Sequence, residues 1–199
     1  MRLLLASASP RRREILATLG LAFDVHPVDA DESERPGEAP RAYLERVVGA
    51  KLALGRTMAE ARGHDAVLVA DTTVVLDGAM LAKPADAADN RRMVRRLAGR
   101  SHEVMTRFAV AATSGASHAE TVVTRVDVRP LDDDAIAAYV ATGEGRDKAG
   151  GYAIQGLGMF AVSRIEGSYT SVVGLPAAEV VAALRGLGLL ARFPLGPAA

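Results

Sequence analysis

The sequence predicts an α/β fold in which a mixed sheet is flanked by helices. Runs of β-type residues alternate with segments of helical periodicity along the chain. Two long β-type runs, 103–113 and 119–129, flank the turn sequence SGAS and form most simply a hairpin. Because a hairpin joins antiparallel neighbours, we expect a sheet with both parallel and antiparallel pairs, not a strictly parallel doubly wound one.

The expected strands are apolar or β-branched runs bounded by turn residues. They lie at 3–6, 23–27, 66–70, 73–76, 103–113, 119–129 and 160–165. The sequence DGAM at 77–80 is typical of a hairpin turn. Asp71 falls between two of the runs, so we expect its carboxylate at a strand end.

The expected helices carry start and stop signals. Ser9 is a favourable N-cap, Pro10 fits the first helical turn and Gly20 ends the helix. Further helices are expected at about 41–62 and within 85–100, 132–145 and 177–187. No linker separates these elements, so residues 1–199 are predicted to form one domain. The N-terminal helical half and the hairpin half then become two lobes around a cleft.

Composition narrows the possible partners. The chain has 24 Lys and Arg and 24 Asp and Glu residues, and this zero net charge argues against a general nucleic-acid or membrane-surface binder. The absence of cysteine excludes disulfides, thiol catalysis and thiolate metal sites, and it fits a reducing cytoplasm. The first apolar run, 3–6, is too short for a signal peptide or a membrane span.

The sequence SASPRRR, at 7–13, combines a helix N-terminus with two serines and three arginines. Cations are unfavourable at a helix N-terminus, whereas backbone N–H groups and guanidinium groups together suit phosphate oxygens. The residues alone leave two interpretations open, a phosphate site and a solvated basic turn.

Several other polar residues have the same double interpretation. Asp71 suits a metal ligand or a proton acceptor, and equally a turn carboxylate that caps local N–H groups. Lys51 and Lys83 suit phosphate-binding point charges or ordinary surface lysines. In the sequence DKAGGYAIQG, at 147–156, glycines permit close approach of a ligand, and Gln155 can pair with a base edge.

Five blocks occur together in one order and carry a family resemblance: LLLASASPRR, ADTTVVLDG, LAKPADAADNRRMVRRLAGRSHEVMT, DKAGGYAIQG and GSYTSVVGLP. From about residue 3 to residue 187 the chain resembles the Maf family of nucleoside triphosphate pyrophosphatases. The resemblance implies an inosine-triphosphatase-like fold and hydrolysis of a nucleoside triphosphate to the monophosphate and pyrophosphate. It also implies a divalent cation, Mg²⁺ or Mn²⁺, a cytoplasmic location and, in many members, a homodimer.

The resemblance assigns roles to individual residues. Asp71 matches the family's proton acceptor, and Glu32 matches an acidic position that helps Asp71 to hold the metal. The residues that match substrate-binding positions are Ser7, Ser9, Arg11, Arg12, Lys51, Thr72, Lys83 and Gln155.

Three positions also indicate a branch of the family. Arg11, Thr72 and Gln155 agree with the branch that acts on dTTP and UTP, whereas a branch acting on 7-methyl-GTP typically has Trp, Gln and Glu there. A neutral glutamine suits a pyrimidine imide edge, whereas a glutamate would suit a cationic methylated guanine. Departures are Ser171, where the family usually has Asn, and Arg13, which extends the arginine pair. Two alternatives remain open: a nucleotide-binding regulator of cell division with little hydrolysis, and the same chemistry on 7-methyl-GTP.

Overall fold

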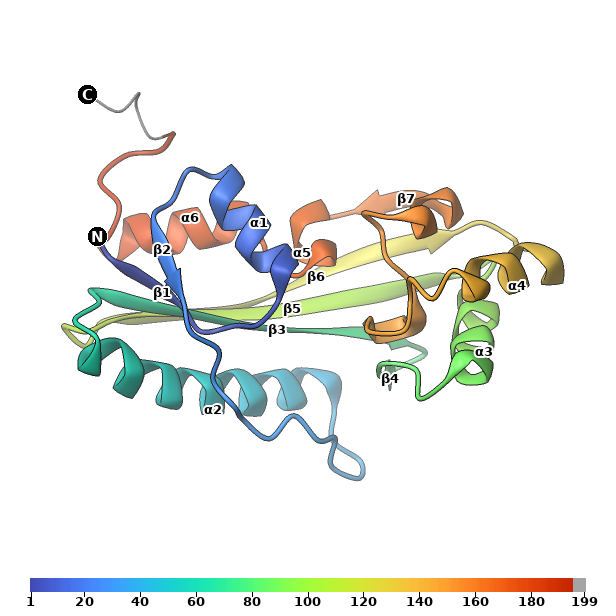
Figure 1. The fold of residues 1–199 in the computed structure, drawn as a ribbon, viewed down its shortest axis with the longest axis horizontal. Coiled ribbons are helices and arrows are strands. Elements are labelled where there is room, and N and C mark those ends of the chain that lie inside the picture. Colours follow the sequence, from blue (N-terminus) through green and yellow to red (C-terminus); the bar gives the residue numbers. More distant parts are fainter. Residues whose placement is uncertain (195–199) are drawn as a thin grey trace.

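The computed structural model describes residues 1–194, so the last five residues of the predicted 1–199 domain lie outside the described residues. The strands are β1 (Leu3–Leu5), β2 (Phe23–Val25), β3 (Ala66–Leu76), β4 (Ala79–Leu81), β5 (Ser101–Ala112), β6 (Ser117–Val128) and β7 (Val162–Glu166). The helices are α1 (Pro10–Thr18), α2 (Pro40–Ala61), α3 (Ala87–Leu97), α4 (Asp133–Ala141), α5 (Tyr169–Val173) and α6 (Ala177–Gly186), with short 3-10 helices η1 (Ala149–Gly151) and η2 (Leu157–Ala161). The predicted α/β class is confirmed (Figure 1). Within residues 1–194, no helix has the length and hydropathy needed to cross a bilayer.

The strands form one mixed sheet in the order β2-β1-β3-β5-β6-β7, and β4 pairs with β3. β1 lies parallel to both β2 and β3, whereas β3, β5, β6 and β7 are antiparallel neighbours. The predicted hairpin is β5–β6, and its long antiparallel ladder extends the sheet far beyond the parallel strands.

The predicted strand end at Asp71 is wrong, because β3 runs through this residue without a break. β5 pairs with β3 from Ala66 to Val75, and Arg107 lies opposite Asp71 in this ladder. The continuous partner strand keeps the backbone extended where the sequence alone indicates an interruption.

The other edge of β3 is covered only at its two ends. β1 pairs with β3 at 66–68, and β4 pairs with it at 74–76. Among residues 1–194, no strand therefore lies beside the segment 69–73, which includes Asp71, on this edge. A polar stretch in the middle of a central strand is thereby left accessible to a ligand.

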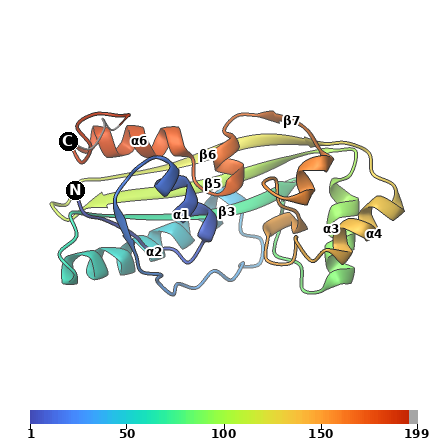
Figure 2. The same ribbon diagram turned by 45° about the horizontal axis from the view of Figure 1, so that its top comes forward.

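Helices cover both faces of the sheet (Figures 1 and 2). α2 packs on one face against a cluster that includes Leu4, Val67 and Val69. α1, α5 and α6 lie on the opposite face, where Leu16 and Leu184 join a second, larger cluster. β3 is buried along nearly its whole length because both of its faces are covered.

α3 and α4 lie together at the far end of the sheet, beside the glycine-rich segment 147–156 (Figure 1). Asn90, a fully buried residue of α3, donates a hydrogen bond of 2.7 Å from Nδ2 to the carbonyl oxygen of Gly151. Gly151 has φ +74°, and a Cβ there would meet this amide, so glycine is required for the approach. The contact fixes the glycine-rich segment opposite the N-terminal end of the molecule.

Candidate active site

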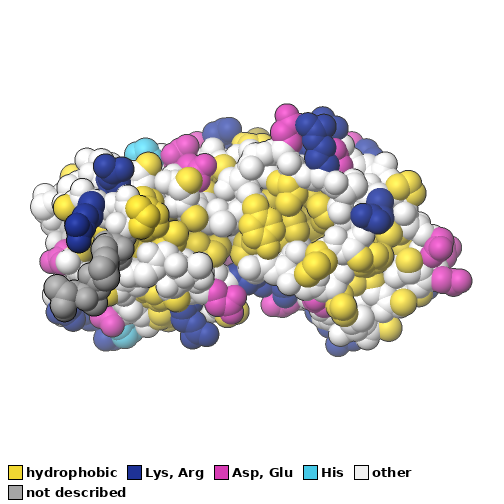
Figure 3. Space-filling view, turned by 90° about the horizontal axis from the view of Figure 1, so that it is seen from above, with side chains coloured by type: hydrophobic (Ala, Val, Ile, Leu, Met, Phe, Trp, Pro, Cys, Tyr) yellow, Lys and Arg dark blue, Asp and Glu magenta, His cyan; other side chains and the backbone are white. Residues whose placement is uncertain are grey.

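A cavity of about 1040 Å³ lies over the uncovered edge of β3 and contains every predicted site residue. These residues are Ser7, Ser9, Arg11, Arg12, Glu32, Lys51, Asp71, Thr72, Lys83 and Gln155. They come from the turn between β1 and α1, α1 itself, the loop before α2, α2, β3, the segment after β4 and the glycine-rich segment. The space-filling view shows an indentation in the outline between the two ends of the molecule (Figure 3).

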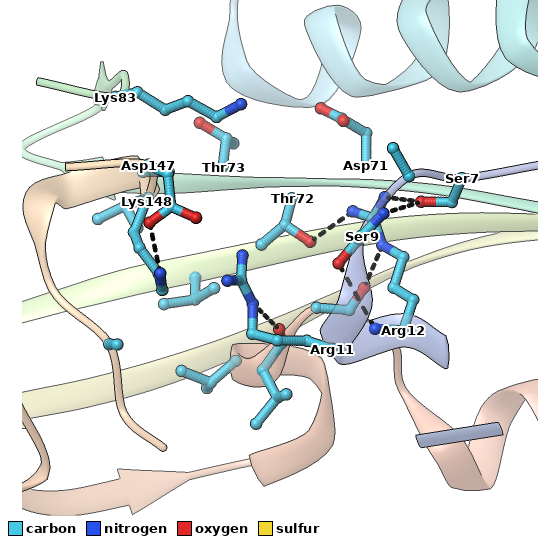
Figure 4. A pocket seen from close by; sticks show the side chains of 18 of the residues that line it. Ser7, Ser9, Arg11, Arg12, Asp71, Thr72, Thr73, Lys83, Asp147 and Lys148 are labelled. Atoms are coloured by element: carbon cyan, nitrogen blue, oxygen red, sulfur yellow. Dashed lines mark hydrogen bonds and ion pairs between the residues drawn. The ribbon is translucent and has the colours of Figure 1, made fainter. Parts of the chain in front are cut away.

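Alternation along β3 sends neighbouring side chains to different parts of this cavity. Asp71 and Thr73 point toward α2, whereas Thr72 points to the opposite side, toward Arg11 and Arg12 (Figure 4). One strand thus contributes to two chemically different groups of residues, an acidic one on the α2 side and a basic one on the α1 side.

The acidic group is built around a buried lysine. The Lys51 ammonium Nζ lies 2.8 Å from Asp71 Oδ1 and 2.6 Å from Glu32 Oε1. The Lys51 side chain is 7% exposed and that of Asp71 is 11% exposed, whereas that of Glu32 is 49% exposed. Burial raises the pKa of Glu32, but the hydrogen bond from Lys51 and the nearby cations outweigh it and lower the pKa below its usual value. Both carboxylates therefore contact one shared cation, the Lys51 ammonium.

α2 brings Lys51 to Asp71 because its buried stripe includes a glycine one turn later. A Cβ on Gly55 would lie 2.9 Å from Cγ2 of Val67 on β3, so only glycine permits this approach of helix and strand. Lys51 also continues a stripe of buried residues at four-residue spacing, with Tyr43 and Val47 before it. This spacing is the sequence signal that distinguishes Lys51 from a surface lysine.

The loop that carries Glu32 is tied to α2. The Tyr43 hydroxyl donates to the Glu32 carbonyl oxygen at 3.2 Å, and burial raises the pKa of Tyr43, which keeps that proton in place. Arg46 donates to the Glu38 carboxylate at 2.6 Å and to the Ser33 carbonyl at 2.8 Å. Tyr43, which lines the cavity, is not among the residues identified from the sequence.

The basic group begins with Arg12, which is buried and held by protein groups. Its Nε donates to the Gly174 carbonyl at 2.8 Å, Nη1 to Ser7 Oγ at 3.1 Å and Nη2 to Thr72 Oγ1 at 3.3 Å (Figure 4). Burial lowers the pKa of Arg12, and the charge of Asp71 raises it. The effect of burial is the larger, so the pKa of Arg12 lies below its usual, very high value. Arg12 therefore joins α1 to the turn after β1, to β3 and to the end of α5.

Arg11 and the two serines present donors to the cavity. Arg11 Nε donates to the Val173 carbonyl at 3.3 Å, and its guanidinium lines the cavity. Ser9 caps α1 by accepting from the Arg12 backbone N–H at 3.5 Å. Ser7 Oγ accepts from Arg12 and from the Ser9 backbone N–H. Because both serine hydroxyls are used as acceptors, their protons remain available to an anion.

Two departures from the family pattern lie outside the cavity. Arg13 is exposed and does not line the cavity, as expected for a residue further into the helix. Ser171 is fully buried in α5 and its hydroxyl has no hydrogen-bond partner among the described residues. Its backbone carbonyl accepts a hydrogen bond of 2.8 Å from Thr106 Oγ1.

The far wall comes from the glycine-rich segment and the end of β4. Lys83 and Gln155 line it, together with Asp147 and Lys148, whose side chains form an ion pair of 2.5 Å (Figure 4). Tyr152 also lines the cavity, and its hydroxyl shares a hydrogen bond of 2.8 Å with His102 Nε2. Local sequence patterns do not predict this contact, because it depends on the position of β5 in the sheet.

The donor set suits a hard divalent cation that also binds phosphate. Within residues 1–194, no three His, Cys, Asp or Glu side chains form a ready-made metal site. Glu32 and Asp71 do lie close enough to share one cation, Lys51, and Mg²⁺ characteristically binds one or two carboxylates plus substrate phosphates. The cavity's five basic residues are balanced by five acidic ones, namely Arg11, Arg12, Lys51, Lys83 and Lys148 against Glu32, Glu34, Asp71, Glu144 and Asp147. A triphosphate would bring charge that these residues do not neutralise, so a bound cation fits the site.

Comparison with known proteins finds relatives along nearly the whole chain. The family model described as Maf-like protein matches residues 2–187. A dTTP/UTP pyrophosphatase of Anaeromyxobacter dehalogenans (strain 2CP-1) is 50% identical over 197 residues, which cover 98% of this chain and 96% of the relative. A dTTP/UTP pyrophosphatase of Geobacter metallireducens is 49% identical over 191 residues, covering 95% and 97%.

The same kind of sheet occurs in solved structures. The HAM1 protein from Coxiella burnetii superposes with a TM-score of 0.50 and 15% sequence identity, over 94% of this chain and 99% of that chain. At this identity the likeness concerns the fold alone, and it agrees with the expected architecture.

Proposed function

Because this chain belongs to the Maf-like protein family, we propose that it hydrolyses dTTP and UTP to the nucleoside monophosphate and pyrophosphate. The observation that carries the proposal is the cavity over β3, which joins an acidic group around Lys51 to a set of phosphate donors at the start of α1. Relatives named dTTP/UTP pyrophosphatase align with this chain over nearly the full length of both proteins, and this supports the choice of substrate.

In the proposed reaction, Asp71 accepts a proton from the water that attacks the α-phosphorus. The water oxygen forms a bond to this phosphorus, and the bond from the α-phosphorus to the bridging oxygen breaks as pyrophosphate leaves with the electron pair. Asp71 is suited to this role because Lys51 orients its carboxylate at 2.8 Å while the other oxygen stays available. A divalent cation, Mg²⁺ or Mn²⁺, held by Glu32 and Asp71, would neutralise the triphosphate and favour an ionised nucleophile.

The remaining residues bind and orient the substrate. We assign the triphosphate to the donors Ser7, Ser9, Arg11, Lys51 and Lys83, with Arg12 holding this group together. Gln155, on the opposite wall, pairs with the pyrimidine edge. Positioning by fixed donors supplies much of the rate of phosphoanhydride cleavage.

The proposal includes features that the sequence and the family resemblance imply. These are one domain over residues 1–199, a cytoplasmic location and a homodimer. The single sheet that contains all strands of residues 1–194 supports the one-domain part. Analytical ultracentrifugation of the full chain tests the dimer.

The deciding experiment measures pyrophosphate release from a panel of canonical and modified triphosphates with Mg²⁺ and with Mn²⁺. We expect release from dTTP and UTP, and a loss of about 10²–10⁴-fold in kcat for Asp71→Asn. Asp77→Asn is the matched control, because Asp77 lies in the exposed turn after the same strand with φ 55°, which asparagine tolerates.

Other outcomes assign a different function. Binding of dTTP without release by the wild-type protein indicates a nucleotide-binding regulator. A preference for 7-methyl-GTP overturns the assignment to the pyrimidine branch.

A further inference from the structure

A line of hydrogen-bonded hydroxyls runs from the cavity into the protein below it. Thr72 on β3 lies opposite Thr106 on β5, and their Oγ1 atoms are 2.9 Å apart. Thr106 is fully buried and does not line the cavity, whereas Thr72 does. Beyond Thr106, the line ends at the carbonyl oxygen of Ser171 in α5, at 2.8 Å.

The acceptor at the end of this line determines the direction of every hydrogen bond in it. A carbonyl oxygen only accepts, so Thr106 donates its one hydroxyl proton to Ser171. The 2.9 Å contact then requires Thr72 to donate its own proton to Thr106. Arg12 has no acceptor atom, so its Nη2 donates to Thr72 at 3.3 Å.

Thr72 consequently offers the cavity an acceptor and no donor. Its proton is directed inward, one lone pair receives Arg12, and the remaining lone pair faces the cavity. Ser7 has the opposite polarity, because its oxygen accepts from Arg12 and Ser9 and its proton is available. The oxygens of an ionised triphosphate are acceptors, so they match Ser7 and are mismatched to Thr72.

We propose that Thr106 is a positioning residue that fixes Thr72 as an acceptor for an N–H or O–H donor of the nucleoside. The inference rests on the proposed function and adds a determinant of substrate choice to it. Thymine and uracil nucleotides share two donors of this kind, the imide N–H of the base and the 3′-hydroxyl of the sugar. Thr72 is thereby assigned to the nucleoside side of the site, although it lies next to Asp71 in sequence.

The test compares kcat/KM for UTP with the values for 3-deaza-UTP and 3′-deoxy-UTP, which each lack one of these donors with little change in size. In the wild-type protein we expect kcat/KM for one of the two analogues to be about tenfold lower than for UTP. The loss of one buried hydrogen bond lowers binding by roughly this factor. In Thr106→Val the Thr72 proton is released and can turn to the cavity. We expect the preference for UTP over that analogue to fall to about threefold or less.

Two further variants separate this role from a general structural one. Thr106→Ser keeps the hydroxyl and should restore the wild-type preference. Thr124→Val is the matched control, because Thr124 is also fully buried and donates to a backbone carbonyl, that of Ser168, at 3.2 Å. Unlike Thr106, it has no hydrogen bond to Thr72 among the described residues. Thr124→Val should keep the preference even where stability or overall activity falls.

The inference is overturned when Thr106→Val keeps the wild-type preference, or when the wild-type protein treats both analogues like UTP. Failure of the proposed function looks different, because no triphosphate then yields pyrophosphate with any variant. In that event, calorimetric binding of UTP and the two analogues to the same variants gives the same comparison. A uniform affinity for all three nucleotides in the wild-type protein overturns the inference there too.

Discussion

The three arginines at the start of α1 have different surroundings, although they are consecutive in the sequence. Arg12 is buried and donates to the Gly174 carbonyl, Arg11 donates to the Val173 carbonyl, and Arg13 is exposed. These carbonyls lie at the C-terminal end of α5, where a helix leaves carbonyl groups without helical partners and favours cations. The unfavourable charge at the start of one helix is thus offset at the end of another.

His102 should make the protein sensitive to acid. Burial lowers the pKa of His102 to about 4, although the charge of Asp127 opposes this, and Nδ1 has no hydrogen-bond partner among the described residues. In the unfolded chain the pKa is about 6.5, so the unfolded state takes up the proton first as the pH falls. The contribution to stability is complete above about pH 6.5 and is lost progressively down to about pH 4.

Urea unfolding at pH 7 and pH 5 measures this loss. Between these values we expect the wild-type protein to lose about 2 kcal/mol more free energy of unfolding than His102→Gln. Glutamine does not titrate and can still accept from the Tyr152 hydroxyl, and all other titrating groups are common to both proteins. An equal loss in both proteins means that His102 is not the acid-sensitive group.

At the scale of elements, the contact of α2 with β3 predicts opposite effects for two glycines of one helix. Gly49→Ala should stabilise the protein by about 0.5–1 kcal/mol, because nothing lies within 4 Å of the added Cβ and alanine favours the helix. Gly55→Ala should destabilise it by about 1–3 kcal/mol, because the added Cβ meets Val67 at 2.9 Å. The displaced helix also moves Lys51 away from Asp71, so kcat/KM should fall by tenfold or more.

Urea midpoints and pyrophosphate release from dTTP test this pair. Gly49→Ala serves as the control for helix propensity, since it changes the same residue type in the same helix. A Gly55→Ala protein with wild-type activity would show that the close approach of α2 is not needed to place Lys51.

Sequence patterns predict those helices and strands whose ends are determined by residues a few positions away in the sequence. Ser9, Asp86 and Asp132 accept from backbone N–H groups at the starts of α1, α3 and α4, where the sequence predicts helices. The continuity of β3 is not predicted, because it depends on pairing with β5, in which Asp71 lies opposite the distant residue Arg107. The short helix α5 is also missed, since its carbonyls are capped by distant arginines.

The site follows the same division between local and distant causes. Arg11, Arg12 and Gln155 are identified from local chemistry together with the family resemblance, and the structure places them in one cavity. Thr106 and His102 are not identified, because their contacts arise from the register of β5 against β3 and from its distance to the glycine-rich segment. Sequence patterns carry residue type and spacing, whereas these contacts require the assembled sheet.

At the scale of the whole molecule, the cavity is made by two distant parts of the chain. The start of α1 provides donors for phosphates, and the glycine-rich segment, held by Asn90, provides Gln155 on the opposite wall. A bound nucleotide therefore connects the two ends of the sheet. When one ligand carries both the triphosphate and the base, binding of one group holds the other close to its own part of the cavity. The affinity of the nucleotide then exceeds that of the separate parts.

Thermal unfolding with Mg²⁺ present tests this bridging. We expect α,β-imido-dTTP to raise the melting temperature by more than the sum of the rises from thymidine and imidodiphosphate at the same concentrations. At about a hundredfold excess over its dissociation constant, a ligand adds roughly 2.7 kcal/mol, or about 5–10 °C for a chain of this size. Gln155→Ala should reduce the rise from α,β-imido-dTTP but leave the rise from imidodiphosphate unchanged, because only the former reaches the far wall. Equal rises from the two ligands would place the whole of the binding energy at the α1 end and remove the far wall from recognition.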